Sequence, residues 1–356
     1  MLLTNDKLTL SIWGESHGEA IGMKLSGIPK GIRIDLDELQ MFVDRRKSVN
    51  SVYSTTRGED DKVIITAGIE NGLTNGAMIE AKILNKTQKS SDYEYLKFTP
   101  RPSHADYPAY VKYQGKLNMS GGGKFSGRMT APICIAGGIA EQILTTKDIV
   151  IGAYVSEIAG IKGLSYQQTE VKVEDVIVAK KATFPILRNS NANCMLEAIE
   201  KAKQEGDSVG GVVEAVAFNL PIGLGDSLFD GLESNISRLL FGIPAVKGVE
   251  FGLGFGIART TGSKANDCYY FDNDQVKTYT NNNGGILGGM TNGMPLTCRV
   301  AFKPTPSISK VQDTVNLLTK ENTQVVTKGR HDACIVPRAA VVVEACIALA
   351  ILESTL

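Results

Sequence analysis

The chain of 356 residues contains only three histidines, and each lies in a short polar segment. His17 lies in GESHG (14–18), His104 in RPSHAD (101–106) and His331 in GRHD (329–332). A single histidine is more often a structural side chain than a catalytic one. With an ordinary pKa near 6.5, however, histidine is the natural proton donor at neutral pH. Three histidines in such segments therefore favour a site that moves protons.

Arginines lie in or beside the same irregular stretches of the chain. The guanidinium group offers a rigid fork of donors that matches phosphate and carboxylate groups. Taken singly, an arginine is more often a solvated surface charge. A cluster gathered from several loops, in contrast, predicts a site for a small polyanion. The arginines concerned are Arg45, Arg46, Arg57, Arg101, Arg128 and Arg330.

Two further segments have the composition of a phosphate site. GGGKFSGR (121–128) precedes an apolar segment, and backbone N–H groups at the start of a helix bind anions. KPTPS (303–307) offers one cation and two hydroxyls, which suit a phosphate or the ribityl chain of a flavin. Each segment, taken alone, is equally well explained as a turn or as a strand end closed by prolines.

Hydrophobic periodicity predicts the elements that position these segments. Alternation predicts strands over 7–13, 62–67, 78–84, 212–218 and 297–302. Asp35 followed by Glu38 resembles a capping box and predicts a helix that runs towards Arg46. Further helices are predicted over 131–144, 194–204, 228–240, 313–320 and 338–353. Strand and helix do not alternate regularly, so an α+β fold is predicted rather than a doubly wound parallel sheet.

Long irregular stretches cover 47–61, 86–128 and 260–294. Loops of this length in a compact domain are usually functional or disordered. The sequence has no G-x-G-x-x-G after a strand and no G-x-x-x-x-G-K-[ST] motif, which argues against Rossmann and P-loop nucleotide sites. The length of 356 residues allows one large domain or two ordinary ones, and no Pro-rich linker or low-complexity run marks a boundary between domains.

Composition argues against several classes of protein. With 38 Lys and Arg against 38 Asp and Glu, the chain lacks the excess positive charge of a nucleic-acid binder. The most apolar stretch is short and contains Glu344, so a membrane span is not expected. The six cysteines form no CxxC pair and are expected to be reduced, buried thiols of a cytoplasmic protein.

Two alternatives remain open from the residues alone. The three histidines with nearby aspartates could form a metal site, although no HxH or HExxH spacing supports one. The arginines alone could form a binding module for a phosphorylated carboxylate that performs no chemistry. The residues thus indicate an enzyme that binds a small polyanion, but they do not indicate its reaction.

Several segments, in the same order along nearly the whole chain, resemble the chorismate synthase family. They are GESHG (14–18), DRR (44–46), RPSHAD (101–106) with KY (112–113), 121–130, AVKGVE (245–250), GGILGG (284–289), KPTPSI (303–308) and GRHD (329–332).

The resemblance implies a fold and a reaction. The fold is a single α+β domain over residues 1–356, with helices sandwiched between antiparallel sheets, and the family assembles as a homotetramer. In the reaction, 5-enolpyruvylshikimate-3-phosphate loses phosphate and a ring hydrogen in an anti-1,4-elimination that gives chorismate, the last step of the shikimate pathway. The elimination is redox-neutral but requires reduced FMN, which passes an electron transiently to the substrate.

The resemblance also assigns roles to residues. His17 is the general acid for the departing phosphate, and His104 faces the flavin and stabilises its negative charge. Asp332, assisted by Ser16 and Ser126, relays a proton from the flavin, while His331 either orients this loop or contacts the ligands. The substrate-binding positions are Arg45, Arg46, Arg101, Arg128 and Arg330. The FMN-binding positions are Lys124, Phe125, Ser126, Pro244, Ala245, Gly288, Lys303, Pro304, Thr305, Pro306, Ser307 and Arg330.

The chain departs from the family pattern at several positions. Val52 stands where relatives often carry an arginine that contacts NADPH, so a built-in NADPH–flavin reductase is not expected, although NADPH is a conceivable reductant. Ser103 replaces a glycine, Lys124-Phe125 replaces an Arg-Ser pair, and Ala333 replaces a proline. These departures concern flavin affinity and loop stiffness more than the reaction.

Overall fold

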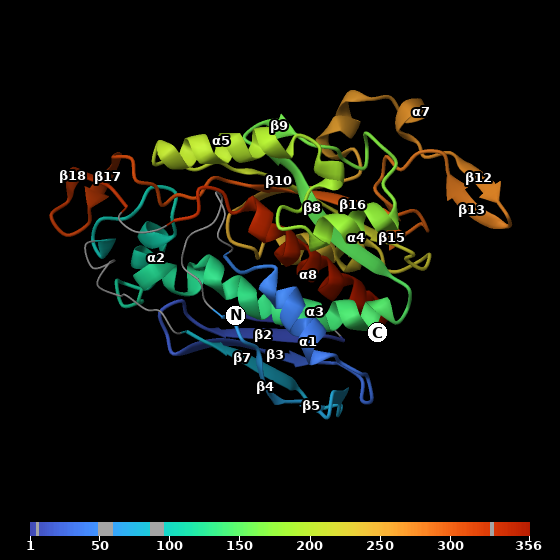
Figure 1. Cartoon of the computed structure of the whole chain (residues 1–356), viewed down its shortest axis with the longest axis horizontal. Helices are drawn as coiled ribbons and strands as arrows, with labels where there is room; N and C mark the ends of the chain where they lie inside the picture. The colour runs from blue at the N-terminus through green and yellow to red at the C-terminus, as the bar shows by residue number, and fades with distance from the viewer. Residues whose placement is uncertain (5–6, 49–59, 86–95, 328–330) are drawn as a thin grey trace.

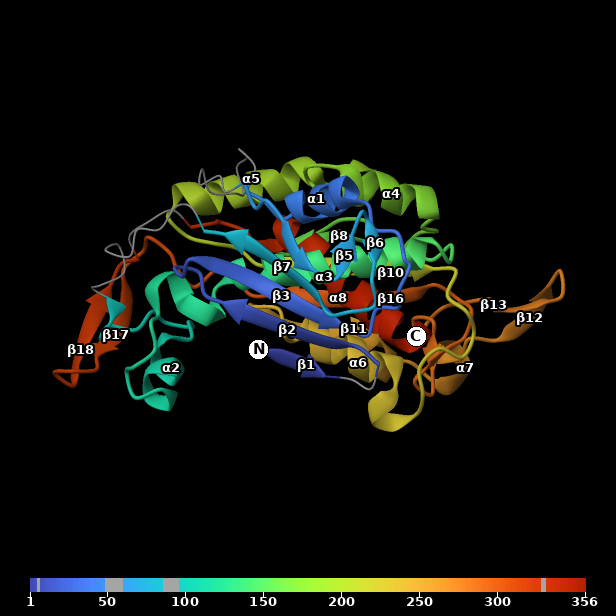
Figure 2. The ribbon, with the colours of Figure 1, turned by 90° about the horizontal axis from the view of Figure 1, so that it is seen from below.

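Two five-stranded antiparallel sheets enclose a layer of helices (Figures 1 and 2). The computed structural model describes residues 1–4, 7–48, 60–85, 96–327 and 331–356. The first sheet has the order β1 (Leu2–Thr4), β2 (Thr9–Gly14), β3 (Ala20–Ser26), β7 (Ile79–Leu84) and β4 (Ile64–Ala67). The second has the order β11 (Val246–Phe251), β16 (Leu296–Phe302), β10 (Gly211–Phe218), β8 (Val150–Ile158) and β9 (Ile161–Lys162). This architecture confirms the α+β fold and the sandwiched helices.

Two apolar helices form the centre of this layer. Helix α3 (Thr130–Thr145) packs on β3 of the first sheet, α8 (Val336–Thr355) packs on β8 and β10 of the second, and the two helices pack against each other. Almost every residue of α8 is buried, as expected for a helix enclosed on all sides. Helices α1 (Leu36–Asp44) and α6 (Leu232–Leu240) flank this pair. One hydrophobic core therefore runs from the first sheet to the second.

Other helices lie against the second sheet. Helix α4 (Val173–Lys181) and α5 (Ala192–Gln204) pack against β8. A second, smaller core joins α4 to β8 and β10 through Val176, Tyr154 and Val216. Residues 153 and 155 of β8 belong to the main core instead, because successive side chains of a strand point to opposite faces.

Most predicted elements are confirmed. The five predicted strands correspond to β2, β4, β7, β10 and β16, and the predicted helices over 131–144, 194–204 and 338–353 correspond to α3, α5 and α8. Asp35 caps α1, since its carboxylate accepts hydrogen bonds from the backbone N–H groups of Asp37 and Glu38. The helix predicted over 228–240 begins only at Leu232, after a 3₁₀ turn over Leu228–Asp230 and the extended Gly231.

The prediction of a helix over 313–320 is wrong. This segment forms a hairpin of β17 (Gln312–Asn316) and β18 (Glu321–Val325). Partly buried and exposed side chains alternate along β17, and Thr314 and Val315 are β-branched residues that favour strands. The Asn316 side chain accepts hydrogen bonds from the backbone of Leu318 and Thr319, which stabilises the turn.

The stretch 260–294 is not irregular throughout. It contains α7 (Gly262–Ala265), the hairpin of β12 (Tyr269–Asp272) and β13 (Gln275–Thr278), and the short pair β14 (Ile286–Leu287) and β15 (Met290–Thr291). The β12–β13 hairpin is an arm that projects from the body of the molecule at the right of Figure 1. The stretch 86–128 contains α2 (Asp106–Lys112), while residues 49–59 and 86–95 lie outside the described part of the chain. A further short pair, β5 (Ile69–Glu70) and β6 (Leu73–Thr74), forms a separate two-stranded sheet.

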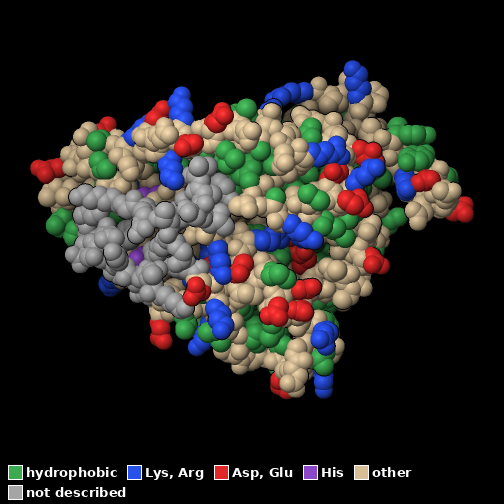
Figure 3. Space-filling model, viewed as in Figure 1, with side chains coloured by type: hydrophobic (Ala, Val, Ile, Leu, Met, Phe, Trp, Pro, Cys, Tyr) green, Lys and Arg blue, Asp and Glu red, His purple; other side chains and the backbone are tan. Residues whose placement is uncertain are grey.

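Positive and negative side chains are interspersed over the described part of the face in Figure 3, in line with the zero formal charge. All six cysteines are free, but only four are buried; Cys194 and Cys268 are exposed, so the prediction of burial is wrong for these two. No helix among the described residues is both long enough and apolar enough to cross a membrane.

Candidate active site

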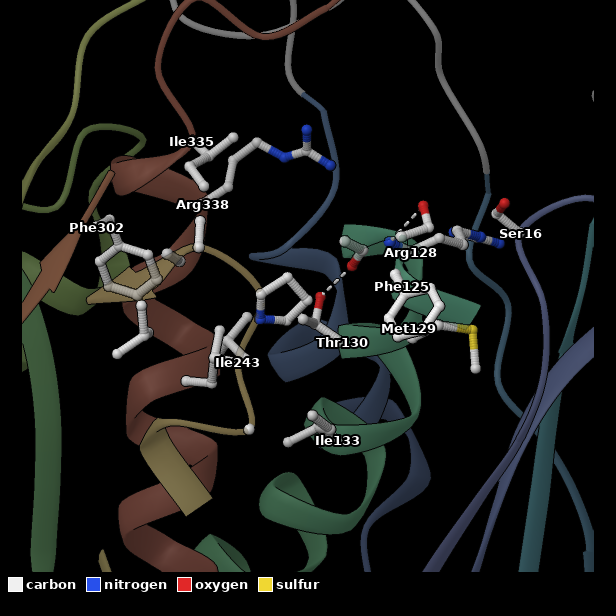
Figure 4. A pocket seen from close by; sticks show the side chains of 18 of the residues that line it. Ser16, Phe125, Arg128, Met129, Thr130, Ile133, Ile243, Phe302, Ile335 and Arg338 are labelled. Carbon is white, nitrogen blue, oxygen red and sulfur yellow. Dashed lines mark hydrogen bonds between the residues drawn. The ribbon is translucent and has the colours of Figure 1, made fainter. Parts of the chain in front are cut away.

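A cavity of about 910 Å³ lies where α3 and α8 begin. This volume is near the upper end of the range of about 300–1,000 Å³ that is usual for small-ligand sites. Thr130 and Ile133 of α3 line one side, and Arg338 of α8 lines another (Figure 4). Because the N-terminal end of a helix is positively polarised, both helices favour an anion in this cavity.

The cavity lining is polar and positive on one part and apolar on another. Among the residues that the structure describes, the lining includes nine lysines and arginines but only two acids, Asp61 and Asp332. An apolar wall contains Ile133, Ile243, Phe302 and Ile335 (Figure 4). The cations are Arg46, Lys47, Arg101, Lys124, Arg128, Arg238, Lys247, Lys303 and Arg338. Such a lining suits ligands that combine a flat apolar ring with phosphate and carboxylate groups.

All three histidines line the cavity, and His17 is held by a glycine loop. It lies in the turn between β2 and β3, where the Ser16 hydroxyl is 3.2 Å from His17 Nδ1. The Ser16 hydroxyl also lies within hydrogen-bond distance of the carbonyl oxygens of Ser120 and Gly121, at 3.1 and 3.2 Å. A Cβ atom on Gly121 would lie 2.0 Å from His17 Cε1. The loop must therefore be glycine here for the histidine to lie so close.

His104 lies on the other side of the same loop and belongs to an ionic cluster. Its Nδ1 is 2.7 Å from Asp106 Oδ1, and Arg101 donates to both oxygens of that carboxylate. Burial alone would raise the pKa of Asp106, but hydrogen bonds and charge from Arg101 and His104 hold it well below its usual range. Arg101 also donates to the Ser307 hydroxyl at 3.2 Å, which connects this cluster to the segment after β16.

A second buried carboxylate organises two more arginines. Asp61 accepts hydrogen bonds from Arg46, at 2.5 Å, and from Arg128. Burial would raise the pKa of Asp61, but the charges of Arg46 and Arg128 lower it below its usual value. Arg128 also donates from Nε to Asn85, whose amide group donates to the backbone of the His17 turn. Arg128 and His17 are thereby fixed relative to each other.

Asp332 pairs with an arginine from the first turn of α8. Arg338 donates to its carboxylate and, from Nε, to the backbone carbonyl of Arg46 at 3.0 Å. Burial lowers the pKa of Arg338, and the charge of Asp332 opposes that effect. The ion pair thus places the predicted proton carrier beside the Arg46 segment.

The predicted FMN segments also reach the cavity. Lys124 donates to the Tyr113 hydroxyl at 2.7 Å and lies over its ring, while Phe125 lines the cavity below Arg128 (Figure 4). Lys303 donates to the backbone carbonyl of Ser103. The other predicted positions in the lining are Ser126, Pro244, Ala245, Thr305, Pro306 and Ser307.

Among the described residues, three predicted positions do not line the cavity. Arg45 is turned away and forms a two-fold ion pair with Glu344, with both distances 2.8 Å. Gly288 lies in the turn between β14 and β15, and Pro304 is exposed beside lining residues. Arg330 lies outside the described residues.

The sequence did not indicate two important lining residues. In the sequence, Asp61 is the last residue of an irregular stretch and Arg338 is the first residue of a predicted apolar helix. Neither position indicates a role in a site. Their partners are Arg46, Arg128 and Asp332, and these pairings arise only from the tertiary fold. Among the described residues, no group of three or more His, Cys, Asp or Glu side chains could hold a metal ion.

Comparison with known proteins identifies the family. A family model described as chorismate synthase matches residues 8–356. The chain belongs to the chorismate synthase family. A chorismate synthase of Dehalococcoides mccartyi is 47% identical over 343 residues, which cover 96% of this chain and 93% of the relative. One of Thermococcus kodakarensis is 44% identical over 349 residues, covering 98% and 96%.

A solved structure agrees with this assignment. A crystal structure of chorismate synthase matches with a TM-score of 0.76 and 26% identity over 99% of this chain and 92% of that chain. Members of this family are lyases that convert 5-enolpyruvylshikimate-3-phosphate into chorismate. This reaction is the last step of the shikimate pathway towards the aromatic amino acids. The family acts on this small molecule and depends on reduced flavin.

Proposed function

We propose that the cavity at the start of α3 and α8 is the active site for this elimination and that its flavin is FMN. The observation that carries the proposal is the lining itself, in which nine cations, three histidines and two acids lie beside an apolar wall. A substrate with two carboxylates and a phosphate requires several cations. A proton-moving site requires the histidines and Asp332, which a simple anion binder would not need.

The residues present fit FMN. The apolar wall suits a flat ring system, and the hydroxyls of Thr305 and Ser307 with the ammonium group of Lys303 suit a phosphate. The Thr305 hydroxyl oxygen is buried and has no hydrogen-bond partner among the described residues, so it is available to a ligand. When bound, the reduced flavin supplies the transient electron that the redox-neutral elimination uses.

The chain's own residues then bind, orient and move protons. Arg46, Arg101 and Arg128 bind the acidic groups of the substrate, because each lines the cavity and is held in place by a buried carboxylate. Arg45 is not proposed for this role, since its guanidinium group is engaged by Glu344. Arg330 keeps its predicted role in binding, outside the described residues.

Two groups carry the protons in this proposal. His17 donates a proton to the departing phosphate, which is a better leaving group when protonated. Asp332, assisted by the hydroxyls of Ser16 and Ser126, carries the ring proton away from the reacting centre. His104 presents its imidazole to the ring system, and His331 completes the lining beside Asp332.

Substitution of His17 separates an enzyme from a binder. We expect His17→Ala to lower kcat about 10²- to 10⁴-fold, the usual contribution of a general acid, with the affinity for the phosphorylated substrate nearly unchanged. Steady-state kinetics and equilibrium binding of the substrate to the FMN-loaded protein give the two quantities. Unchanged turnover would exclude His17 as the acid, and a loss confined to affinity would favour a binding role.

A further inference from the structure

Asp106 is a buried carboxylate that joins two cavity-lining groups without itself lining the cavity. Its Oδ1 lies 2.7 Å from His104 Nδ1 and 2.9 Å from Arg101 Nη2. Its Oδ2 accepts from Arg101 Nε at 2.7 Å and from the Arg101 backbone N–H at 3.0 Å. Only 7% of the residue is exposed, so solvent contributes little to these interactions.

These contacts determine which imidazole nitrogen of His104 carries the hydrogen. An ionised carboxylate can only accept hydrogen bonds, and Arg101 and His104 hold the pKa of Asp106 well below its usual range against the effect of burial. Arg101 Nη2 also lies 3.0 Å from His104 Nδ1, but this donor has Asp106 Oδ1 as its acceptor at 2.9 Å. A bare Nδ1 would instead face the lone pairs of the carboxylate at 2.7 Å. We therefore assign the hydrogen to His104 Nδ1, which donates it to Asp106. Nε2 is the ring atom left for a ligand, and it faces the glycine loop, where a Cβ atom on Gly122 would lie 3.5 Å away.

The backbone from Arg101 to Asp106 forms a tight turn. His104 N–H donates to the carbonyl of Arg101 at 3.2 Å, and Ser103 between them has a φ of +59°, a conformation uncommon for a residue other than glycine. Asp106, at the start of α2, also accepts from the Arg101 backbone N–H. The turn thus brings Arg101 and His104 to one carboxylate, and Arg101 extends the connection to Ser307.

We propose that Asp106 is a positioning residue for the elimination. It holds His104 in the Nδ1–H form with Nε2 available to the ligands, and it orients the Arg101 guanidinium group between itself and Ser307. Asp106 acts only through these two side chains. The inference rests on the proposed function for its effect on turnover, whereas the form of His104 can be measured without any reaction.

Asp106→Asn is the informative substitution. The amide oxygen is expected to take the Oδ2 position, where it keeps the hydrogen bonds from Arg101 Nε and the Arg101 backbone N–H. The amide NH₂ group then lies at the Oδ1 position against His104 Nδ1, and Arg101 Nη2 loses its acceptor there. Because NH₂ can only donate, His104 must then accept at Nδ1 and carry its hydrogen on Nε2. The tautomer presented to the ligands is thereby reversed, while the volume of the side chain is conserved.

The tautomer can be read by ¹⁵N NMR of the FMN-loaded protein labelled at histidine. The chain has only three histidines, so single His→Gln variants assign every signal. We expect Nδ1–H for His104 in the wild type and Nε2–H in Asp106→Asn. We also expect kcat to fall about 10²- to 10⁴-fold in that variant, with KM changed much less, and Asp106→Glu to recover part of the loss.

Asp175→Asn is the matched control. Asp175 also accepts two hydrogen bonds from one arginine, Arg188, at 2.8 and 3.0 Å, but it contacts no histidine and lies outside the cavity. The Asp175→Asn substitution should leave kcat and the His104 signals unchanged. An Nε2–H signal for His104 in the wild type would overturn the proposal, even if Asp106→Asn fails to fold. Wild-type kcat in a folded Asp106→Asn protein would overturn it too. Absence of chorismate with the wild type would instead contradict the proposed function.

Discussion

At the scale of single residues, the placement of His17 depends on the absence of a side chain at Gly121. Gly121 has a φ of +61°, and a Cβ atom there would lie 2.0 Å from His17 Cε1 and 2.3 Å from Nδ1. The loop backbone is fixed by Ser16, whose hydroxyl lies 3.2 Å from the carbonyl of Gly121. The imidazole, rather than the loop, would therefore have to move if a methyl group were added.

Gly121→Ala tests this dependence. We expect kcat to fall at least about tenfold, because a small misplacement of a catalytic group is costly, and stability to fall by about 1–2 kcal/mol from the left-handed backbone. Kinetics and urea unfolding measure the two effects. Gly256→Ala is the control, since nothing lies within 4 Å of the added Cβ. Full activity of a folded Gly121→Ala protein would show that His17 is not fixed by this loop.

The sequence predicts residues of this kind well when they lie in one short segment. The histidines with their adjacent glycines and arginines could be predicted because each segment carries its own composition. The sequence could not show which of Arg45 and Arg46 reaches the cavity. Adjacent residues near the end of a helix point in directions about 100° apart, and the sequence does not show which direction leads to the cavity. Arg46 consequently reaches Asp61 and the cavity, whereas Arg45 reaches Glu344.

At the scale of elements, a buried ionic network joins four helices behind the cavity. Glu344 of α8 accepts from Arg45 at the end of α1 and from Lys180 of α4, with all three distances 2.8 Å, and Lys180 also pairs with Glu141 of α3. Burial and the charge of Glu344 raise the pKa of Glu141 to about 8. Burial would also raise the pKa of Glu344, but Arg45 and Lys180 hold it well below its usual range. The raised pKa of Glu141 therefore favours the protonated form of this carboxyl group beside the ionised Glu344.

Neutral substitutions should distinguish the two carboxylates. Glu344→Gln leaves two buried cations without their main countercharge and should cost about 3–5 kcal/mol of unfolding free energy. Glu141→Gln replaces a protonated acid with a neutral amide and should cost less than about 1 kcal/mol at pH 7. Urea unfolding of both variants measures this difference. Equal costs at pH 7 would contradict the assignment of the proton to Glu141.

The raised pKa of Glu141 also predicts the direction of a pH dependence. From its ordinary value of 4.5 up to about 8, the folded chain holds a proton that the unfolded chain releases. The contribution of Glu141 to the free energy of unfolding therefore falls as pH rises through this window. Glu141→Gln should remove that part of the slope between pH 6 and 8. An unchanged slope in the variant would contradict the assignment.

Sequence periodicity predicted most elements but not the 312–325 hairpin. Helices α3 and α8 were predictable because long apolar segments have few other solutions. Leu317 and Leu318 make the hairpin segment apolar, which favoured the prediction of a helix, but both lie in the turn between its two strands. Short segments are decided by tertiary contacts such as the hydrogen bond from Leu317 N–H to the carbonyl of Phe98.

At the scale of the whole molecule, we propose that four copies of the chain assemble and that the enzyme works in the cytoplasm. Large apolar side chains are exposed on the β12–β13 arm at Phe271 and Tyr279, in the turn before α6 at Phe229, and in the turn after β11 at Phe255. Exposed apolar side chains that gather into a large patch mark protein interfaces, and we propose that assembly covers these groups. Light scattering should give four times the 38.2 kDa of the chain. A mass of one chain at micromolar concentration would contradict the tetramer.

The most direct test of the account is the reaction itself. The protein is incubated with 5-enolpyruvylshikimate-3-phosphate and FMN without oxygen, with and without a chemical reductant, and phosphate and chorismate are quantified. We predict equal amounts of both products, formed only when FMN is reduced. NADPH in place of the reductant should give no product, since Val52, outside the described residues, stands where the resemblance to the family implies an arginine for NADPH contact. No product from folded protein with reduced FMN bound would contradict the account and leave only a binder of phosphorylated carboxylates.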